Sequence, residues 1–144
     1  MMEAVFPSPP VLYPGRTLPL NLLIRCLPIR LGGFIPIRLR KLAISLRSTT
    51  AITAGVRHTS WTSSRVLLDL HGLDEPVRCH SKADSFTEID SNIFGNVIIP
   101  EAAPSFSTRT VEQKYLLEVK AAFTLGSAGK LSVSSCTPLA LERC

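Results

Sequence analysis

Residues 111–125 constrain the fold most, because apolar and polar side chains alternate there over a long stretch. The odd-numbered positions hold Val111, Tyr115, Leu117, Val119, Ala121, Phe123 and Leu125, and the even-numbered positions hold Lys114, Glu118 and Lys120. A period of two puts successive side chains on opposite faces of an extended backbone. This segment is therefore predicted to be a half-buried β-strand, much longer than the average strand of about six residues.

A second alternating run follows it and predicts a hairpin. Leu131 and Val133 alternate with Ser132 and Ser134, and residues 126–129 form a short connection with a glycine at each end. Two alternating runs joined by such a connection are typical of neighbouring antiparallel strands.

The first half of the chain contains three further apolar runs with a period of two. They consist of Leu18, Leu20, Leu22 and Ile24, then Ile35, Ile37, Leu39, Leu42, Ile44 and Leu46, then Val66, Leu68 and Leu70. In the second of these runs the apolar parity changes at Arg40 and Lys41, so the inward face changes there. A β-bulge or a bend is predicted at these two residues.

These patterns together define the expected fold class. No segment shows a period of 3.6 over the ten or so residues that a helix needs, and turns separate the runs. Strands without intervening helices predict an all-β, antiparallel β-sandwich. Trp61, Phe106 and Tyr115 are expected to be core or turn-packing aromatic residues.

The length and composition set the domain organisation. A chain of 144 residues, 45% of them apolar, can bury one core but not two. We expect a flexible Pro-rich leader at residues 1–10 and one domain over residues 11–144, with a long polar loop at about 73–92.

The sequence contains no long uncharged apolar run, and we recognise no secretory signal in it. The four cysteines are widely spaced, as in proteins of a reducing compartment. The expected location is the cytoplasm, free or peripheral at membranes, and the pattern leaves the oligomeric state open.

Positive charge is concentrated in the first half of the chain. The first 65 residues hold nine Lys and Arg against one Glu, whereas the remaining residues hold seven against ten Asp and Glu. The candidate partner-binding basic face consists of Arg38, Arg40, Lys41 and Arg47. Arginine binds carboxylates and phosphates through paired N–H groups. An acidic or phosphorylated protein tail, or anionic lipid, could therefore bind to this face. The alternative is an ordinary solvated strand face. Nucleic acid is not expected, because the arginines alternate with core residues and do not cluster with aromatic ones.

No motif for catalysis, a cofactor or a metal is found. His58, His71 and His80 lie among serines and aspartates, but the G-x-S-x-G turn of a hydrolase is absent. Glycine motifs that cradle phosphate are absent too, and neither the cysteine spacing nor the acidic loop matches a zinc or EF-hand site. The chain is predicted not to be an enzyme and to have no cofactor.

The order of four segments resembles that of fungal arrestin-like proteins. These segments, which lie between about residues 11 and 141, are YPGRTLPLNLLIRC, IPIRLRKLAISLRSTTAITAG, NVIIPEAAPSFSTRTVEQKYLLEVK and GKLSVSSCTPLAL. A Gly-led strand, a long strand, a loop and a Pro-Ser-Phe turn before a Tyr-x-Leu-x-Val strand recur in that family in this order. The resemblance implies an immunoglobulin-like sandwich similar to the second of the two sandwiches of an arrestin. It also implies an adaptor that links cytoplasmic tails of membrane proteins to trafficking or ubiquitin machinery.

The sequence departs from that family in two ways. The Pro9-Pro10-Val11-Leu12-Tyr13 segment is one residue too long for the Pro-Pro-x-Tyr motif that recruits ubiquitin ligases. The length also suits one sandwich, so we expect either a short relative, the product of a truncated gene model, or an arm that needs its partner domain. Three functions stay open: a protein-binding adaptor, a peripheral module that binds anionic lipid through the same basic face, and a fragment without independent function. In the last case residues 111–125 are expected to form an exposed edge.

Overall fold

A computed structural model describes residues 2–5, 11–18, 20–25, 37–77, 86–89, 91–93, 97–101, 105–125 and 129–142. The strands are β1 (Met2–Val5), β2 (Val11–Leu12), β3 (Asn21–Arg25), β4 (Ile37–Ala54), β5 (Arg57–Leu70), β6 (Glu75–Val77), β7 (Phe86–Glu88), β8 (Phe106–Ser107), β9 (Val111–Leu125) and β10 (Lys130–Leu141). The described helical structure is one 3-10 turn, Ser91–Ile93. The protein is therefore all-β, as the sequence predicts.

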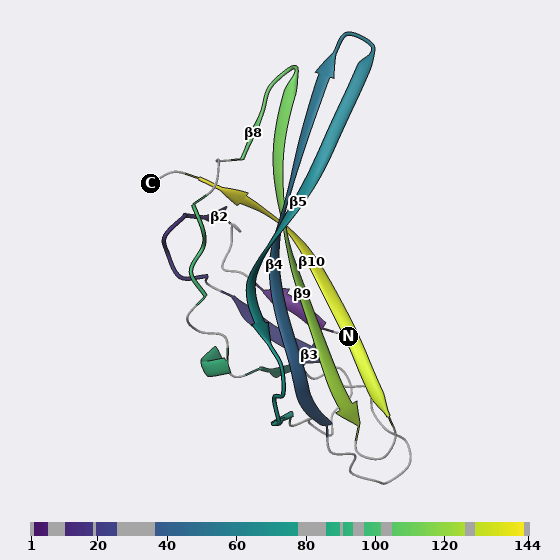
Figure 1. Cartoon of the computed structure of the whole chain (residues 1–144). Coiled ribbons are helices and arrows are strands. Elements are labelled where there is room, and N and C mark those ends of the chain that lie inside the picture. The colour runs from purple at the N-terminus through teal and green to yellow at the C-terminus, as the bar shows by residue number, and fades with distance from the viewer. Residues whose placement is uncertain are drawn as a thin grey trace.

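Three long strands form the centre of the larger sheet. Its order is β2-β10-β9-β4-β5, with β6 beside β4 and β8 beside β9, and every pairing except β10 with β2 is antiparallel. The predicted hairpin is confirmed, because β10 pairs with β9 from Lys130 opposite Thr124 to Leu139 opposite Tyr115. Figure 1 shows β4 and β9 extending from the lower end of the molecule toward its upper end, with β10 beside β9 over the lower part.

The predicted change of face in β4 is confirmed as a β-bulge. Leu39 pairs with Phe123 of β9 and Lys41 pairs with Ala122, so Arg40 has no partner in the register. The extra residue lets Leu39 and Leu42 both face the core although they are three positions apart, and both are completely buried. Arg40 and Lys41 consequently lie on the outer face one after the other.

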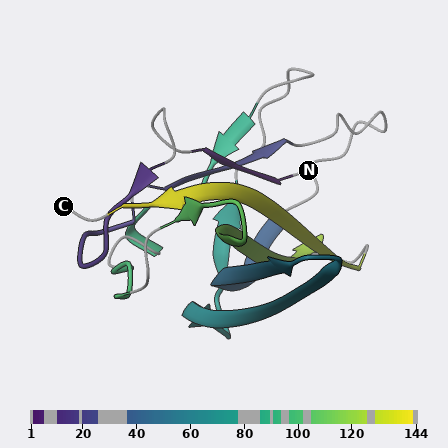
Figure 2. The same cartoon turned by 90° about the horizontal axis from the view of Figure 1, so that it is seen from above.

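A second, smaller sheet covers the inner face of the larger one. It has the order β1-β3-β7 and is antiparallel throughout. Its central strand contributes Leu22, which is completely buried. The residues of the larger sheet that share this core include Leu39, Leu42, Ile44, Leu46, Tyr115, Leu117, Val119, Ala121, Phe123, Leu139 and Leu141. Seen from above, the two layers lie one over the other (Figure 2). The fold is a β-sandwich.

The larger sheet extends past the core at the end where β4 turns into β5. There the two strands project together beyond the smaller sheet (Figure 1). Gly55 and Val56 make the turn, Gly55 has a φ of 63°, and the Val56 side chain is fully exposed. All residues of β5 from Arg57 to Val66 are exposed, because no second layer of the described structure covers this part.

The structure differs from several expectations. Met2–Val5, expected in a flexible leader, pair with β3 through β1, while residues 6–10 lie outside the described residues. The polar segment at 73–92 contains β6, β7 and the 3-10 turn. The expected exposed edge at residues 111–125 is wrong, because β9 lies inside the sheet between β4 and β10.

The aromatic residues divide between the core and the surface. Tyr115 is buried, whereas Trp61 is 51% exposed and Phe106 is 43% exposed. Trp61 lies on the projecting part of β5, opposite Thr50 of β4. The expectation of a core or turn-packing position is therefore wrong for Trp61, and the reason is that the sandwich ends before the strand does.

Candidate functional site

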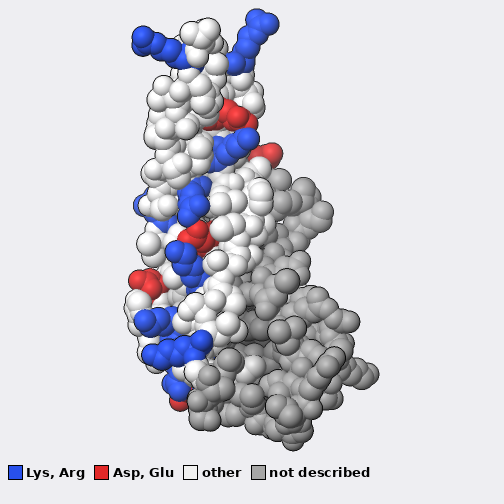
Figure 3. All heavy atoms as spheres, turned by 90° about the vertical axis from the view of Figure 1, so that its right-hand side faces the viewer, with Lys and Arg blue, Asp and Glu red and all other residues white. Residues whose placement is uncertain are grey.

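The four basic residues predicted from the sequence share the outer face of β4. Leu39, Leu42, Ile44 and Leu46 point into the core, and the remaining positions of the strand between Arg38 and Arg47 point away from it. Figure 3 shows Lys and Arg side chains in a column along the molecule, with Asp and Glu side chains among them. The four residues therefore lie on one face of the strand, and the local cause is the alternation of the strand together with the bulge.

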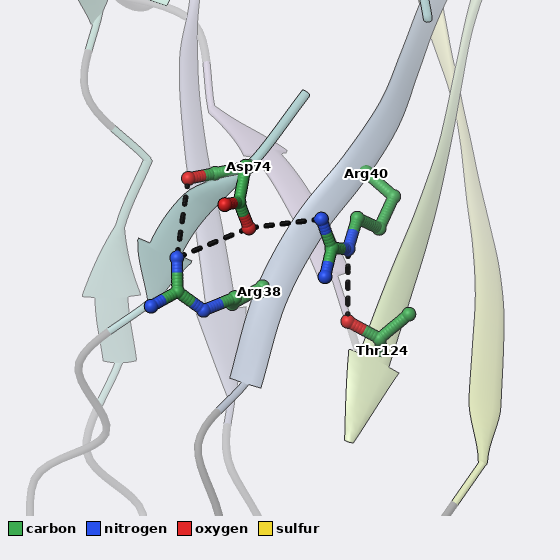
Figure 4. Close-up of polar contacts among 4 residues, drawn as sticks. All are labelled: Arg38, Arg40, Asp74 and Thr124. Carbon is green, nitrogen blue, oxygen red and sulfur yellow. Dashed lines mark hydrogen bonds and ion pairs between the residues drawn. The ribbon is translucent and has the colours of Figure 1, made fainter. Parts of the chain in front are cut away.

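A shared carboxylate holds two of the arginines together. The Oδ1 atom of Asp74 lies 3.0 Å from Nη1 of Arg38 and 2.9 Å from Nη1 of Arg40. Arg40 Nε donates a hydrogen bond of 3.1 Å to Oγ1 of Thr124 on β9. Figure 4 shows Asp74 between the two guanidinium groups, with Thr124 on the far side of Arg40. The pairing of β6 with the start of β4 brings Asp74 here, because Asp74 directly precedes β6.

Lys41 completes what we call the bulge cluster, the residues Arg38, Arg40 and Lys41. Its side chain is exposed and forms no ion pair with a described residue. Among the described residues, one carboxylate is therefore paired with two of these three cations. Both arginines remain more than 40% exposed at their side chains, so their other N–H groups are accessible to a ligand.

Arg47 does not belong to this cluster. It lies six positions after Lys41, or about 20 Å along an extended strand, and its guanidinium forms an ion pair with Glu118 of β9. Lys120 binds the same carboxylate at 3.2 Å. The hydrogen bond from Lys120, followed by the charge of Arg47, holds the pKa of Glu118 below its ordinary value. The basic face predicted from the sequence thus divides into an open cluster and a neutralised pair.

Lys130 is a cation of this face that reasoning on β4 alone misses. Lys130 of β10 pairs with Thr124 of β9, and Thr124 pairs with Arg38 of β4. Residues in direct register lie on the same face of a sheet, so Lys130 extends the bulge cluster sideways across three strands. Its side chain is exposed and has no ion pair among the described residues. The alternation in the predicted hairpin could have indicated that Lys130 lies on this face. The position of Asp74 could not be predicted in the same way, because Asp74 lies in a polar segment without a period.

The described residues were searched for two other features, a metal site and a membrane-spanning helix. No group of three or more His, Cys, Asp and Glu side chains in this part of the chain could hold a metal ion. Cys79 and His80 lie outside it. No helix in the described part is long and apolar enough to cross a bilayer. What the site offers is a set of accessible cationic hydrogen-bond donors on a rigid sheet.

The fold and the site define a structural class, an all-β sandwich with a basic outer face. No protein-family description matches the sequence, and no curated protein matches it either. Among solved structures, the sporulation control protein Spo0M of Bacillus subtilis matches with a TM-score of 0.50 and 10% sequence identity. The match covers 98% of this chain and 48% of Spo0M, so the chain spans about half the length of that protein.

Spo0M has an arrestin-like fold. The comparison therefore agrees with the all-β sandwich and with the coarser part of the resemblance, the arrestin-like fold. It does not support a fungal origin, since Spo0M is bacterial. At 10% identity the likeness shows the fold alone.

Proposed function

We propose that this protein is a non-enzymatic, protein-binding adaptor whose bulge cluster binds an acidic segment of a partner. The observation that carries the proposal is the excess of positive charge at the bulge, where Arg38 and Arg40 share the carboxylate of Asp74 and the neighbouring Lys41 has no ion pair with a described residue. Guanidinium groups bind carboxylates and phosphates with geometric specificity. The arrestin-like fold supports an adaptor or regulator role.

The position of Asp74 defines how such a partner would bind. Its carboxylate already accepts from both arginines, so an acidic ligand either adds to the free N–H groups or displaces Asp74. In both cases Asp74 repels an incoming anion, and its removal should strengthen binding. An ordinary solvated face makes no such prediction, because no ligand competes with Asp74 there.

The adaptor would act on cytoplasmic tails of membrane proteins, in trafficking, either free in the cytoplasm or peripheral at a membrane. Acidic or phosphorylated tails carry the charge that the bulge cluster complements. Electrostatic complementarity of this kind contributes more to association rate and specificity than to affinity. Binding should therefore weaken steeply with salt.

The experiment titrates a fluorescent, extended poly-glutamate peptide against the full chain and follows fluorescence anisotropy. The Arg38→Glu, Arg40→Glu double variant should lower the affinity by about tenfold or more, since two charge-assisted contacts are lost. Asp74→Asn should raise the affinity by about two- to fivefold, the range expected for an exposed ion pair. A peptide with serine in place of glutamate should not bind.

The matched control is the double variant Arg57→Glu, Arg109→Glu. Both arginines are exposed and lie outside the bulge cluster, and their reversal changes the net charge by the same amount. If it weakens binding as much as the reversal at Arg38 and Arg40, only general charge matters and the site assignment is refuted. A parallel flotation assay with phosphatidylserine vesicles covers the lipid alternative. Binding to vesicles but not to the peptide would replace the protein-binding proposal with a membrane-binding one.

A further inference from the structure

The strand β5 forms one edge of the larger sheet. It is last in the order β2-β10-β9-β4-β5 and pairs only with β4 among the described strands. On the other side of Arg57–Leu70, no described strand takes up the main-chain N–H and C=O groups. An open edge is a template for another strand, and natural proteins usually protect their edges with proline, lysine, a bulge or a cover.

The opposite edge of the sheet shows such protection. Strand β10 carries Lys130 and Pro138, and β2 covers its end by pairing with Ala140 and Leu141. Strand β5 has neither proline nor lysine. Its one irregularity lies at Leu67, where Ile44 pairs with Leu68 but Ser45 pairs with Val66. Residues 57–66 are left as a regular, exposed template ten residues long.

The sequence of this template is complementary to itself about Ser63. In an antiparallel pair of two copies centred there, Trp61 of each copy lies opposite Arg65 of the other, and Thr62 lies opposite Ser64. Trp61, Ser63 and Arg65 share one face, because their partners on β4 are Thr50, Ser48 and Leu46. The two opposed Trp61 and Arg65 pairs would therefore form cation–π contacts.

Hydroxyl pairing of this kind already occurs along β5. The Oγ atoms of Ser48 and Ser63 are 2.7 Å apart across the β4–β5 pair, and the Oγ1 atoms of Thr49 and Thr62 are 3.3 Å apart. Serine and threonine side chains opposite each other stabilise neighbouring strands. A second copy would continue the same pattern on the open side.

We propose that two copies of this chain associate through β5, antiparallel and two-fold symmetric, with Ser63 at the axis. Such an interface uses the same patch on both copies. Electrostatics favours this register over the one centred on Trp61. Moving the axis to Trp61 would set Arg57 opposite Arg65 of the other copy, whereas the axis at Ser63 sets Arg65 opposite an aromatic ring. The proposal does not depend on the bulge cluster, which lies on β4 away from this edge.

Sedimentation equilibrium over a wide range of protein concentration tests the association. The full chain should show a monomer–dimer equilibrium. Arg65→Glu should raise the dimer dissociation constant by about tenfold, because both cation–π contacts are lost. The matched control Arg109→Glu makes the same charge change at an exposed site outside β5 and should leave the constant unchanged. Circular dichroism confirms that each variant is folded.

Disulfide crosslinking tests the register in a parent whose four native cysteines are replaced by serine. Ser63→Cys should form a covalent dimer on oxidation, since the two copies of residue 63 meet at the axis. Ser60→Cys should not, since its two copies would be six positions, or about 20 Å, apart. A chain that stays monomeric at all concentrations overturns the proposal, as does a dimer that Arg65→Glu leaves intact. A monomer that instead binds a heterologous acidic strand at β5 also overturns it.

Discussion

Deletion of Arg40 should be tolerated, because Arg40 is the extra residue of the bulge. Without it, Leu39 and Leu42 are separated by Lys41 alone, and a regular strand still points both leucines into the core. Deletion of Ala43 is the matched control, since it shortens the same strand by one residue at a regular position. The two deletions lie only three positions apart, but their effects on the free energy of unfolding should differ strongly.

The losses on deletion of Arg40 are small contacts at the surface. The ion pair with Asp74 joins side chains that are 42% and 60% exposed, and such a pair contributes about 0–1 kcal/mol. The hydrogen bonds from Arg40 Nε to Thr124 and from the Leu73 N–H to the Arg40 carbonyl contribute about 1 kcal/mol each. The free energy of unfolding should fall by about 2 kcal/mol.

Deletion of Ala43 forces a buried side chain out of the core. If the bulge persists, either Leu39 and Leu42 or Ile44 and Leu46 must turn outward. If the bulge is lost instead, Leu42 turns outward and Lys41 turns inward. Leu42 is completely buried, and the loss of one buried leucine alone costs about 3–5 kcal/mol. The burial of a lysine or serine adds to this cost.

Urea unfolding followed by circular dichroism measures both deletions against the full chain. The Arg40 deletion should shift the midpoint moderately at unchanged m-value, and the Ala43 deletion should unfold at much lower urea or fail to fold. Equal destabilisation by the two deletions would refute the assignment of Arg40 as the bulge residue. The Arg40 deletion should also weaken binding of the acidic peptide, since it removes one cation of the bulge cluster.

Three further predictions concern the core, the ion pairs and the exposed turn. Leu117→Ala should lower the free energy of unfolding by about 3–5 kcal/mol in urea titrations, because this side chain at the centre of β9 is completely buried; a loss below about 1 kcal/mol would show that the site collapses freely. The pKa of Glu118 is lowered by the hydrogen bond from Lys120 and by the charge of Arg47, so its stabilisation is complete above the ordinary value of 4.5 and disappears as pH falls through the lowered pKa. The stability difference between the protein and Glu118→Gln should therefore vanish in acid, and a difference that persists there would exclude the charge as its cause. Gly55→Ala should cost about 1 kcal/mol, because the φ of 63° is unfavourable for a residue with a Cβ atom although nothing lies close to it; thermal melting measures this, and an unchanged melting temperature would contradict it.

The alternation of side chains was sufficient to predict β9, the hairpin with β10 and the core-facing part of β4. The period of two at residues 111–125 fixed which side chains of β9 are buried, and the change of parity at Arg40 located the bulge. These features are local consequences of an extended backbone with one apolar face. For the same reason the sequence placed Arg38, Arg40, Lys41 and Arg47 on one outer face.

The order of the strands and the partners of the charges depend on contacts between distant segments. Nothing in residues 111–125 indicates that β9 lies between β4 and β10, since an edge strand and a central strand can have the same alternation. Asp74 reaches Arg38 and Arg40 only because β6 pairs with the start of β4. The partition of the basic face into an open cluster and a neutralised pair follows from these pairings.

The sequence by itself determined the all-β class, the buried faces and the bulge, because each depends on the spacing of neighbouring residues. Only the tertiary structure decided which strand is left at the edge and where the sandwich ends. Trp61 illustrates the difference: its residue type suits a core, yet the smaller sheet does not reach β5 at that point and the ring remains 51% exposed. Burial is a property of the layer opposite a side chain, and that layer comes from other parts of the chain.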